Sequence, residues 1–278
     1  MVKLADICSR QNDKFKEVQK LAAAKYRKKK MQFGVEGRRE IERALAAGMV
    51  MAELWFAGES LPVWLEEVVV DSFSLQCYRI PHHLFEKLVM RKGSADTVYA
   101  VFHCPTKEGL DSLKPLLEPL ATSHARFLVL DGVEKPGNLG AILRTADAAG
   151  VDAVFVLTED TVHDLYHPHV IRASLGAVFS QCVLPVGLRE LRTWLGRHQV
   201  ACYRADLCAS SVSYVHAQYD RSIALLLGSE AFGPSAAAQE VFQDALHIDM
   251  CGIGDSLNVS AAAAVFCYKM LEFKHKST

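Results

Sequence analysis

Polar and charged side chains follow three apolar segments in the second half of this 278-residue chain. The segment LVLDG is followed by Asn138 and Arg144, and the segment ALLLGS is followed by Glu230. The segment ALHIDMCG is followed by Ser256 and Asn258, directly before the alanine-rich stretch VSAAAAVFCYKM. Amides, a hydroxyl, a carboxylate and a guanidinium can bind a sugar or a phosphate and assist a proton transfer. These five residues form the candidate catalytic set.

Each cluster also has a simpler structural explanation. Asn138 can cap a helix, and Glu230 suits the first turn of the helix that follows it. For the first cluster taken alone, the catalytic and structural interpretations are equally good. The third cluster favours chemistry, because a cap needs one Ser or Asn and this segment supplies both Ser256 and Asn258.

Short apolar segments recur from residue 126 onward and are separated by helix-like stretches. They read RFLVLDG, DAVFVLT, QCVLPVG, QVACYRADL, SIALLLGS and ALHIDMCG. Strands rich in Val, Ile and Leu that alternate with helices indicate an α/β fold with a parallel sheet covered on both faces. Such sheets bind ligands beyond the carboxyl ends of their strands, which is where the candidate residues follow in the chain.

The first hundred residues have a different pattern. Residues 5–30 predict a helix that ends in KYRKKK, and FGVEGRREIERALAAG predicts a strand and a helix ended by Gly48. AELWFAG, LEEVVVDS and TVYAVFHC are expected strands, and IPHHLFEKL is an expected helix. The proline-containing stretch before residue 124 is typical of a linker. We expect a domain at residues 1–104, a linker at 105–123 and a second domain at 124–278.

The net charge of −1 conceals an uneven distribution of charge. The first 43 residues contain 13 Lys and Arg against 6 Asp and Glu. A basic segment on an otherwise acidic protein suggests a polyanionic partner, although a solvated lysine-rich helix has the same composition. The candidate phosphate contacts are Lys14, Lys16, Arg27, Lys28, Lys29, Lys30, Arg38 and Arg39.

Composition argues against a membrane or a secreted protein. Half of the residues are hydrophobic, but the longest uncharged stretch near the C-terminus is too short to span a bilayer. The N-terminus lacks the apolar core of a signal peptide. Eight scattered cysteines without a CxxC pair suggest reduced thiols, and we therefore expect a cytoplasmic protein.

Three histidines, His163, His167 and His169, invite a metal interpretation. Their spacing is not accompanied by the cysteines or carboxylates of a catalytic zinc site. We therefore expect no metal.

Together the three clusters resemble the signature motifs of the SpoU–TrmH family of RNA 2'-O-ribose methyltransferases. The pattern N-x-G-x-x-x-R-T-A begins at Asn138, G-x-E-x-x-G begins at Gly228, and I-x-M-x-G…S-L-N-V-S-x-A begins at Ile248. HPHVIRASLGAVF is also family-like, and the match covers about residues 126–273. One departure is Asp249, where proline is usual.

The resemblance implies methyl transfer from S-adenosylmethionine to a ribose 2'-hydroxyl of RNA, with 23S-type ribosomal RNA favoured. It implies a C-terminal domain with a deep trefoil knot, a homodimer, and an N-terminal RNA-binding domain similar to a small ribosomal protein. Its motifs place the catalytic surface at Asn138, Arg144, Glu230, Ser256 and Asn258, the cofactor contacts at Gly228, Ile248, Met250 and Leu257, and an RNA contact at Arg172.

Several alternatives stay open at this point. Arg144 or Glu230 could assist removal of the hydroxyl proton, although a guanidinium is a poor proton acceptor. The substrate could be transfer RNA, or the protein could bind RNA without catalysis. A nucleotide-dependent oxidoreductase is disfavoured, because the chain lacks a suitable glycine fingerprint.

Overall fold

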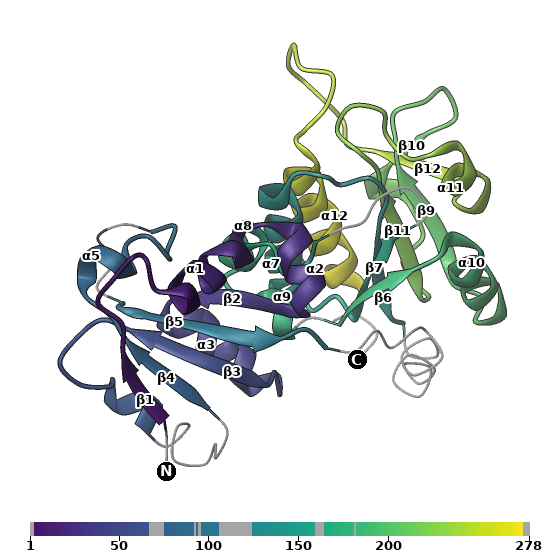
Figure 1. Cartoon of the computed structure of the whole chain (residues 1–278). Coiled ribbons are helices and arrows are strands. Elements are labelled where there is room, and N and C mark those ends of the chain that lie inside the picture. Colours follow the sequence, from purple (N-terminus) through teal and green to yellow (C-terminus); the bar gives the residue numbers. More distant parts are fainter. Residues whose placement is uncertain are drawn as a thin grey trace. The chain divides into compact units, whose positions relative to one another are not determined.

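The structure is a computed structural model that describes residues 3–66, 75–91, 93, 96–105, 124–158, 164–180 and 182–274 (Figure 1). The chain divides into two compact units. The first combines Met1–Thr106 with Asp164–Ser180, and the second combines Lys107–His163 with Gln181–Thr278. Nearly all of the expected linker at 105–123 lies outside the described residues, so the linker stays a prediction. The sequence did not predict that residues 164–180 belong to the first unit.

The first unit contains a five-stranded mixed sheet in the order β1-β4-β3-β5-β2. β5 is antiparallel to β2 and β3, whereas β4 is parallel to β1 and β3. The strands are β1 (Lys3–Asp6), β2 (Gln32–Glu36), β3 (Met51–Phe56), β4 (Gln76–Arg79) and β5 (Val98–His103). The N-terminal part is therefore an α+β unit, and its mixture of strands and helices agrees with the sequence pattern.

Short helices flank this sheet. They are α1 (Asp13–Gln19), η1 (Lys20–Ala22), α2 (Ala24–Lys30), α3 (Arg38–Ala46), η2 (Val63–Leu65), α5 (His82–Phe85), α8 (Pro168–Ala173) and α9 (Ala177–Ser180).

The single helix expected over residues 5–30 is wrong. A strand comes first, and α1 begins only after Asn12, whose side chain accepts hydrogen bonds from the backbone N–H groups of Lys14 and Phe15. Ala23 then adopts an extended backbone that separates η1 from α2. Most of LEEVVVDS lies outside the described residues, so that strand stays a prediction.

Aromatic stacking explains why residues 164–180 belong to the first unit. The ring of Phe33, on β2, stacks on Tyr166 with the centroids 4.3 Å apart, and on Phe179 at 5.8 Å. Phe33 is fully buried. Burying a side chain of this size stabilises a fold by about 1.5–3 kcal/mol, so these contacts hold α8 and α9 against the sheet.

The second unit contains a seven-stranded sheet in the order β10-β12-β9-β11-β6-β7-β8, and all its pairings among the described residues are parallel. The strands are β6 (Arg126–Leu130), β7 (Ala153–Leu157), β8 (Val183–Val186), β9 (Ala201–Ala205), β10 (Val212–Ser213), β11 (Ile223–Leu227) and β12 (Asp244–His247). All six predicted strands are confirmed. The two-residue β10 was not predicted, because so short a strand leaves no pattern.

Helices cover both faces of this sheet, as the apolar strands require. They are α7 (Pro136–Ala148), α10 (Leu188–Arg197), η3 (Tyr214–His216), α11 (Ala236–Val241) and α12 (Val259–Lys274). On one face Trp194 of α10 packs against Phe127 and Phe155 with ring centroids 5.4 and 5.7 Å apart. On the other face α12 lies along α7 (Figure 1).

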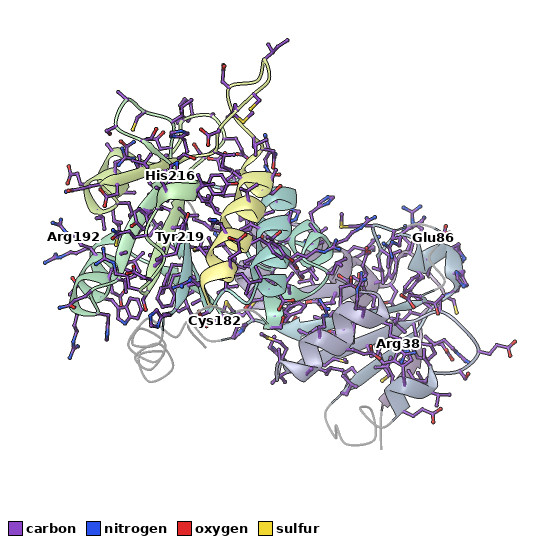
Figure 2. All side chains as sticks on the ribbon, turned by 180° about the vertical axis from the view of Figure 1, so that it is seen from behind. Arg38, Glu86, Cys182, Arg192, His216 and Tyr219 are labelled. Carbon is purple, nitrogen blue, oxygen red and sulfur yellow. The ribbon has the colours of Figure 1, made fainter. Side chains whose placement is uncertain are left out.

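A buried arginine at the start of β6, Arg126, forms a hydrogen bond with α12. Arg126 is 2% exposed, and its guanidinium donates to the backbone carbonyls of Tyr219 (2.8 Å), Arg221 (2.7 Å) and Met270 (3.3 Å). Burial lowers the pKa of Arg126. Figure 2 shows Tyr219 inside the unit and Arg192 at its periphery.

The alanine-rich helix α12 is only partly buried in the single chain. One face of α12 is buried, through Val259, Ala263, Phe266 and neighbouring residues. On the opposite face Tyr268 is 51% exposed. The helix therefore presents a small-residue face to solvent.

Candidate active site

Helix α7 carries the first two candidate residues. Pro136 at its first turn favours helix initiation, and Leu139, Leu143 and Ala146 anchor the helix to the sheet. Asn138 is half-buried and Arg144 is exposed. Because they are six residues apart, they lie roughly 120° apart around the helix. Helix α7 thus presents two different polar faces.

A tight turn after β11, residues 228–234, positions Glu230; we call it the glycine turn. The Ser229 N–H donates to the Gly233 carbonyl at 3.0 Å, and the Gly233 N–H donates back to the Ser229 carbonyl at 3.0 Å. A Cβ on Gly228 would lie 2.2 Å from the backbone of Gly233 and Pro234, so only glycine fits. Glu230 is exposed on this turn.

Residues 249–258 join β12 to α12 and are all exposed; in Figure 1 this yellow segment stands out from the rest of its unit. Asn258 ends the segment and caps α12. Its Oδ1 accepts from the Ser260 N–H at 2.9 Å and from the Ser260 hydroxyl at 2.6 Å. Ser260 is a contributor that the sequence reasoning did not assign to the site.

The three segments meet in a side-chain network that we call the Asn–Glu network: Asn138, Glu230 and Asn258. The Asn258 amide donates to Asn138 Oδ1 at 3.3 Å, and the Asn138 amide donates to the Glu230 carboxylate. Asn138 therefore uses both ends of its amide, which fixes its orientation. Residues 138, 230 and 258 lie far apart in the chain, and their contact is the central feature of the site.

Two predicted residues remain outside this network. Among the described residues, neither Arg144 nor Ser256 makes a hydrogen bond or an ion pair, and both side chains are exposed. A guanidinium without a protein partner is available to an anionic ligand.

The predicted cofactor contacts lie around the same edge of the sheet. Gly228 is buried at the end of β11, and Ile248 is half-buried after β12. Met250 and Leu257 are 38% and 39% exposed, and Ile253 between them is fully exposed. These apolar side chains are therefore uncovered in the single chain.

Asp249 stands where the family pattern has proline, and its side chain is fixed by contacts with two other side chains. Its carboxylate accepts from the Ser213 hydroxyl at 2.5 Å and lies 3.4 Å from His247 Nε2. The bond from Ser213 is the main cause that lowers the pKa of Asp249. Since Ser213 belongs to β10, the contact fixes the beginning of the exposed 249–258 segment to the sheet.

Arg27 does not present its charge to solvent. It is 3% exposed, and its guanidinium donates to the carbonyls of Leu21 (2.5 Å) and Ala22 (2.7 Å) and to Asp164 Oδ2. A phosphate cannot reach this side chain in the folded unit, so we leave Arg27 out of the proposed RNA surface.

The other basic candidates differ in their partners. Lys14 pairs with Glu53 and Glu17, and Lys30 pairs with Glu17. Three further ion pairs join residues that are at most four positions apart in the sequence: Lys16–Asp13, Arg38–Glu42 and Arg39–Glu40. In the described part of the chain, Lys28 and Lys29 are exposed and have no ion pair. Figure 2 shows Arg38 at the surface of the first unit.

Arg172 lines a cavity of about 380 Å³ in the first unit. Lys87 and Arg91 line it too, but so do Glu36 and Glu40. The cavity therefore carries charges of both signs and is not a simple anion site.

Of the three histidines, His163 lies outside the described residues. The His167 ring accepts a hydrogen bond from the His169 N–H at 3.1 Å and so caps α8, and burial lowers the pKa of His167. Over the ranges that the structure describes, no group of three His, Cys, Asp or Glu residues could hold a metal ion. No helix in those ranges is long and apolar enough to cross a membrane.

The second unit thus combines a parallel sheet with a polar network at its edge, and the first unit is a separate α+β unit. Two family models match the chain: the SpoU rRNA Methylase family over residues 125–268, and an MRM3-like substrate binding domain over residues 12–98. The chain belongs to the SpoU rRNA methylase family. The predicted resemblance is thereby confirmed.

Individual relatives cover nearly the whole chain. The 23S rRNA (guanosine(2553)-2'-O)-methyltransferase RlmP of Bacillus subtilis (strain 168) is 32% identical over 96% of this chain and 99% of its own. A crystal structure of an RNA 2'-O ribose methyltransferase is 33% identical, with a TM-score of 0.77 over 98% of this chain and 100% of that one. An rRNA methyltransferase from Sinorhizobium meliloti shares the fold, with a TM-score of 0.84 at 23% identity over 97% of this chain and 98% of that one.

Proposed function

We propose that this protein is a cytoplasmic enzyme that methylates a ribose 2'-hydroxyl of large-subunit ribosomal RNA, with S-adenosylmethionine as the methyl donor. The observation that carries the proposal is the Asn–Glu network, in which three sequence-distant motifs meet at one edge of the sheet. Similarity to RlmP over nearly the whole chain favours 23S-type RNA over transfer RNA.

S-adenosylmethionine supplies an electrophilic methyl group. Gly228, Ile248, Met250 and Leu257 are the residues that would hold it, through backbone groups and apolar side chains. The glycine turn serves this role because its backbone is closely packed and fixed before any ligand binds.

Glu230 is the better placed proton acceptor of the two charged candidates. Its carboxylate is exposed and is oriented by the Asn138 amide, whereas a guanidinium has no lone pair that readily accepts a proton. Arg144 instead binds the phosphate next to the target ribose and stabilises the developing alkoxide. Ser256 and Asn258 complete the surface that receives the sugar.

The enzyme functions as a homodimer in this proposal, and its C-terminal domain contains the trefoil knot of its family. The exposed face of α12, with Ala261 and the half-exposed Tyr268, is suited to close packing against a second subunit. Such a contact would bury the small-residue face that the single chain leaves open.

Purified protein, tritiated S-adenosylmethionine and large-subunit RNA from cells that lack the gene provide the test. We expect one labelled 2'-O-methylnucleoside, no label on transfer RNA, and at least a tenfold loss of turnover for Asn138→Ala and Arg144→Lys. Lysine keeps the charge but loses the planar fork that binds phosphate with two hydrogen bonds. Calorimetry with S-adenosylhomocysteine checks that both variants keep cofactor affinity.

Two results would contradict the proposal. Binding of RNA without any methyl transfer would indicate a non-catalytic RNA-binding protein, and label on transfer RNA alone would assign the other substrate. Wild-type turnover in Arg144→Lys would remove the bidentate role of Arg144 but leave the reaction class standing.

A further inference from the structure

The glycine turn exposes one large aromatic ring. Phe232 is 91% exposed, although phenylalanine is among the residue types most often buried. Its neighbours within the turn are the exposed Ala231, the charged Glu230 and Gly233. Within the turn, the ring therefore has no apolar neighbour of its own size to pack against.

Hydrogen bonds hold the turn in the conformation that exposes the ring. The Phe232 N–H donates to the Ser229 hydroxyl at 3.1 Å, and the same hydroxyl donates to the Gly233 carbonyl at 3.3 Å. Two backbone bonds between Ser229 and Gly233 close the turn. Gly233 has φ +66°, a conformation that favours glycine, and Gly228 packs against it. The backbone that carries Phe232 is thus fixed in advance of any partner.

The turn also connects the ring to the candidate chemistry. Glu230, two residues before Phe232, belongs to the Asn–Glu network. A ligand whose reacting atom lies beside Glu230 therefore extends towards the same turn. RNA offers flat, uncharged surfaces at this position, because each ribose carries a nucleobase, and in a single-stranded target that base is free to stack on a protein side chain.

We propose that Phe232 stacks on an unpaired nucleobase of the RNA substrate, at or next to the nucleotide that is methylated. This inference rests on the proposed function and adds a substrate-positioning residue to it. Stacking on an aromatic ring tolerates any base, so the contact secures the geometry of a single-stranded target and leaves base identity to other groups. A ring on a fixed turn loses little conformational freedom when the base binds.

The test compares Phe232→Ala, Phe232→Leu and Phe232→Trp with the wild type. Leu207→Ala is the matched control, because Leu207 is 67% exposed in the same unit and lies outside the site. The substrate is large-subunit RNA from cells that lack the gene. RNA affinity, KM and kcat are measured, together with the Kd for S-adenosylhomocysteine and the mass of the protein by light scattering.

We expect Phe232→Ala to raise the KM for RNA about tenfold, the effect of losing one stacked base. Phe232→Leu should behave like Phe232→Ala, and Phe232→Trp should restore the wild-type KM, because stacking needs a planar ring. The Kd for S-adenosylhomocysteine and the light-scattering mass should not change in any variant, and Leu207→Ala should match the wild type.

Three outcomes would overturn the inference. Wild-type KM in Phe232→Ala would show that no base contacts the ring, and wild-type behaviour of Phe232→Leu would show apolar burial without stacking. A lower mass with an unchanged KM would assign Phe232 to a contact between two copies of the chain. If the wild type methylates no RNA, the proposed function fails; if it does and these variants match it, only this inference fails.

Discussion

The chain uses basic residues in opposite ways in two regions. In the basic segment, residues 14–30 of the first unit, Arg27 is buried among backbone carbonyls, and Lys14 and Lys30 pair with Glu17. On helix α7 of the second unit, Arg144 is exposed and has no partner among the described residues. The first region is dense in charge, and Lys14, Lys16, Arg27 and Lys30, half of its eight basic residues, form ion pairs within the fold. In the second unit, Arg144 stays available to a ligand.

Charge density in a sequence is therefore a poor guide to where an anion binds. A guanidinium taken out of water needs partners for its five N–H donors, and Arg27 finds them in Leu21, Ala22 and Asp164. A solitary cation such as Arg144, on a helix fixed by its buried face, keeps its hydrogen-bonding capacity for a ligand. The hydrogen-bond partners of an arginine within the fold, more than the composition of its segment, indicate whether it has a structural or a ligand-binding role.

The largest expected effect comes from removing the buried cation. Arg27→Ala should lower the free energy of unfolding by about 3–5 kcal/mol, because it leaves Asp164 and the carbonyls of Leu21 and Ala22 without this donor. Urea unfolding followed by tryptophan fluorescence measures this loss. Arg38→Ala, which removes an exposed helical pair, is the matched control and should cost less than about 1 kcal/mol. A stable Arg27→Ala variant that loses RNA affinity would reverse our assignment and make Arg27 an RNA contact.

A smaller effect is expected when the unpaired lysines are removed. Lys28→Ala with Lys29→Ala should weaken RNA binding and reduce the slope of log K against log salt concentration by about 1–2, one unit for each phosphate that a lysine no longer neutralises. A truncation of residues 1–30 is unsuitable for this test, because Phe15, Val18 and Leu21 belong to the core. Filter binding over a range of salt concentrations provides the measurement. An unchanged slope would show that this surface does not contact the RNA backbone.

The smallest effect concerns the paired carboxylate. The bond from Lys30 is the main cause that lowers the pKa of Glu17 to about 2 from its usual 4.5. A carboxyl whose pKa is lowered by folding stabilises the protein above pH 4.5, and this contribution is lost as the pH falls towards 2. Because Glu17 is partly exposed, Glu17→Gln should cost only about 0–1 kcal/mol at pH 7.

Urea unfolding of wild type and Glu17→Gln at a series of pH values between 7 and 2 tests this prediction. The difference between the two proteins should shrink across the acid range and vanish near pH 2. A difference that persists unchanged at the acid end would mean that Glu17 contributes through packing and not through its charge.

Most of the second unit was predictable from sequence, because buried parallel strands are long apolar segments. β6, β7 and β11 are fully buried along their lengths, and their sequences show it. The Asn–Glu network was predictable as a set of candidates, since Asn138, Glu230 and Asn258 each follow such a strand. The hydrogen bonds among these three residues were not predictable. They depend on which strands are neighbours in the sheet, and the sequence pattern does not give that order.

The first unit was harder to predict, because its helices are short and their limits depend on single contacts. Asn12 and Ala23 divide what periodicity alone presents as one helix. The inclusion of residues 164–180 depends on the stacking of Phe33 with Tyr166 and Phe179, a contact across more than 130 positions of the chain. Exposure is equally invisible in sequence, so Phe232 first stands out in the structure.

The strand order of the second unit also constrains how the protein can be made. β12 comes last among the strands of its sheet in the chain, yet it pairs with β9 on one side and β10 on the other. During synthesis, β9 exposes an open backbone edge and β10 has no strand to pair with until residues 244–247 leave the ribosome. Unpaired edges of this kind invite aggregation of a nascent chain. Stalled translation or proteolytic trimming just before Asp244 should therefore yield insoluble fragments.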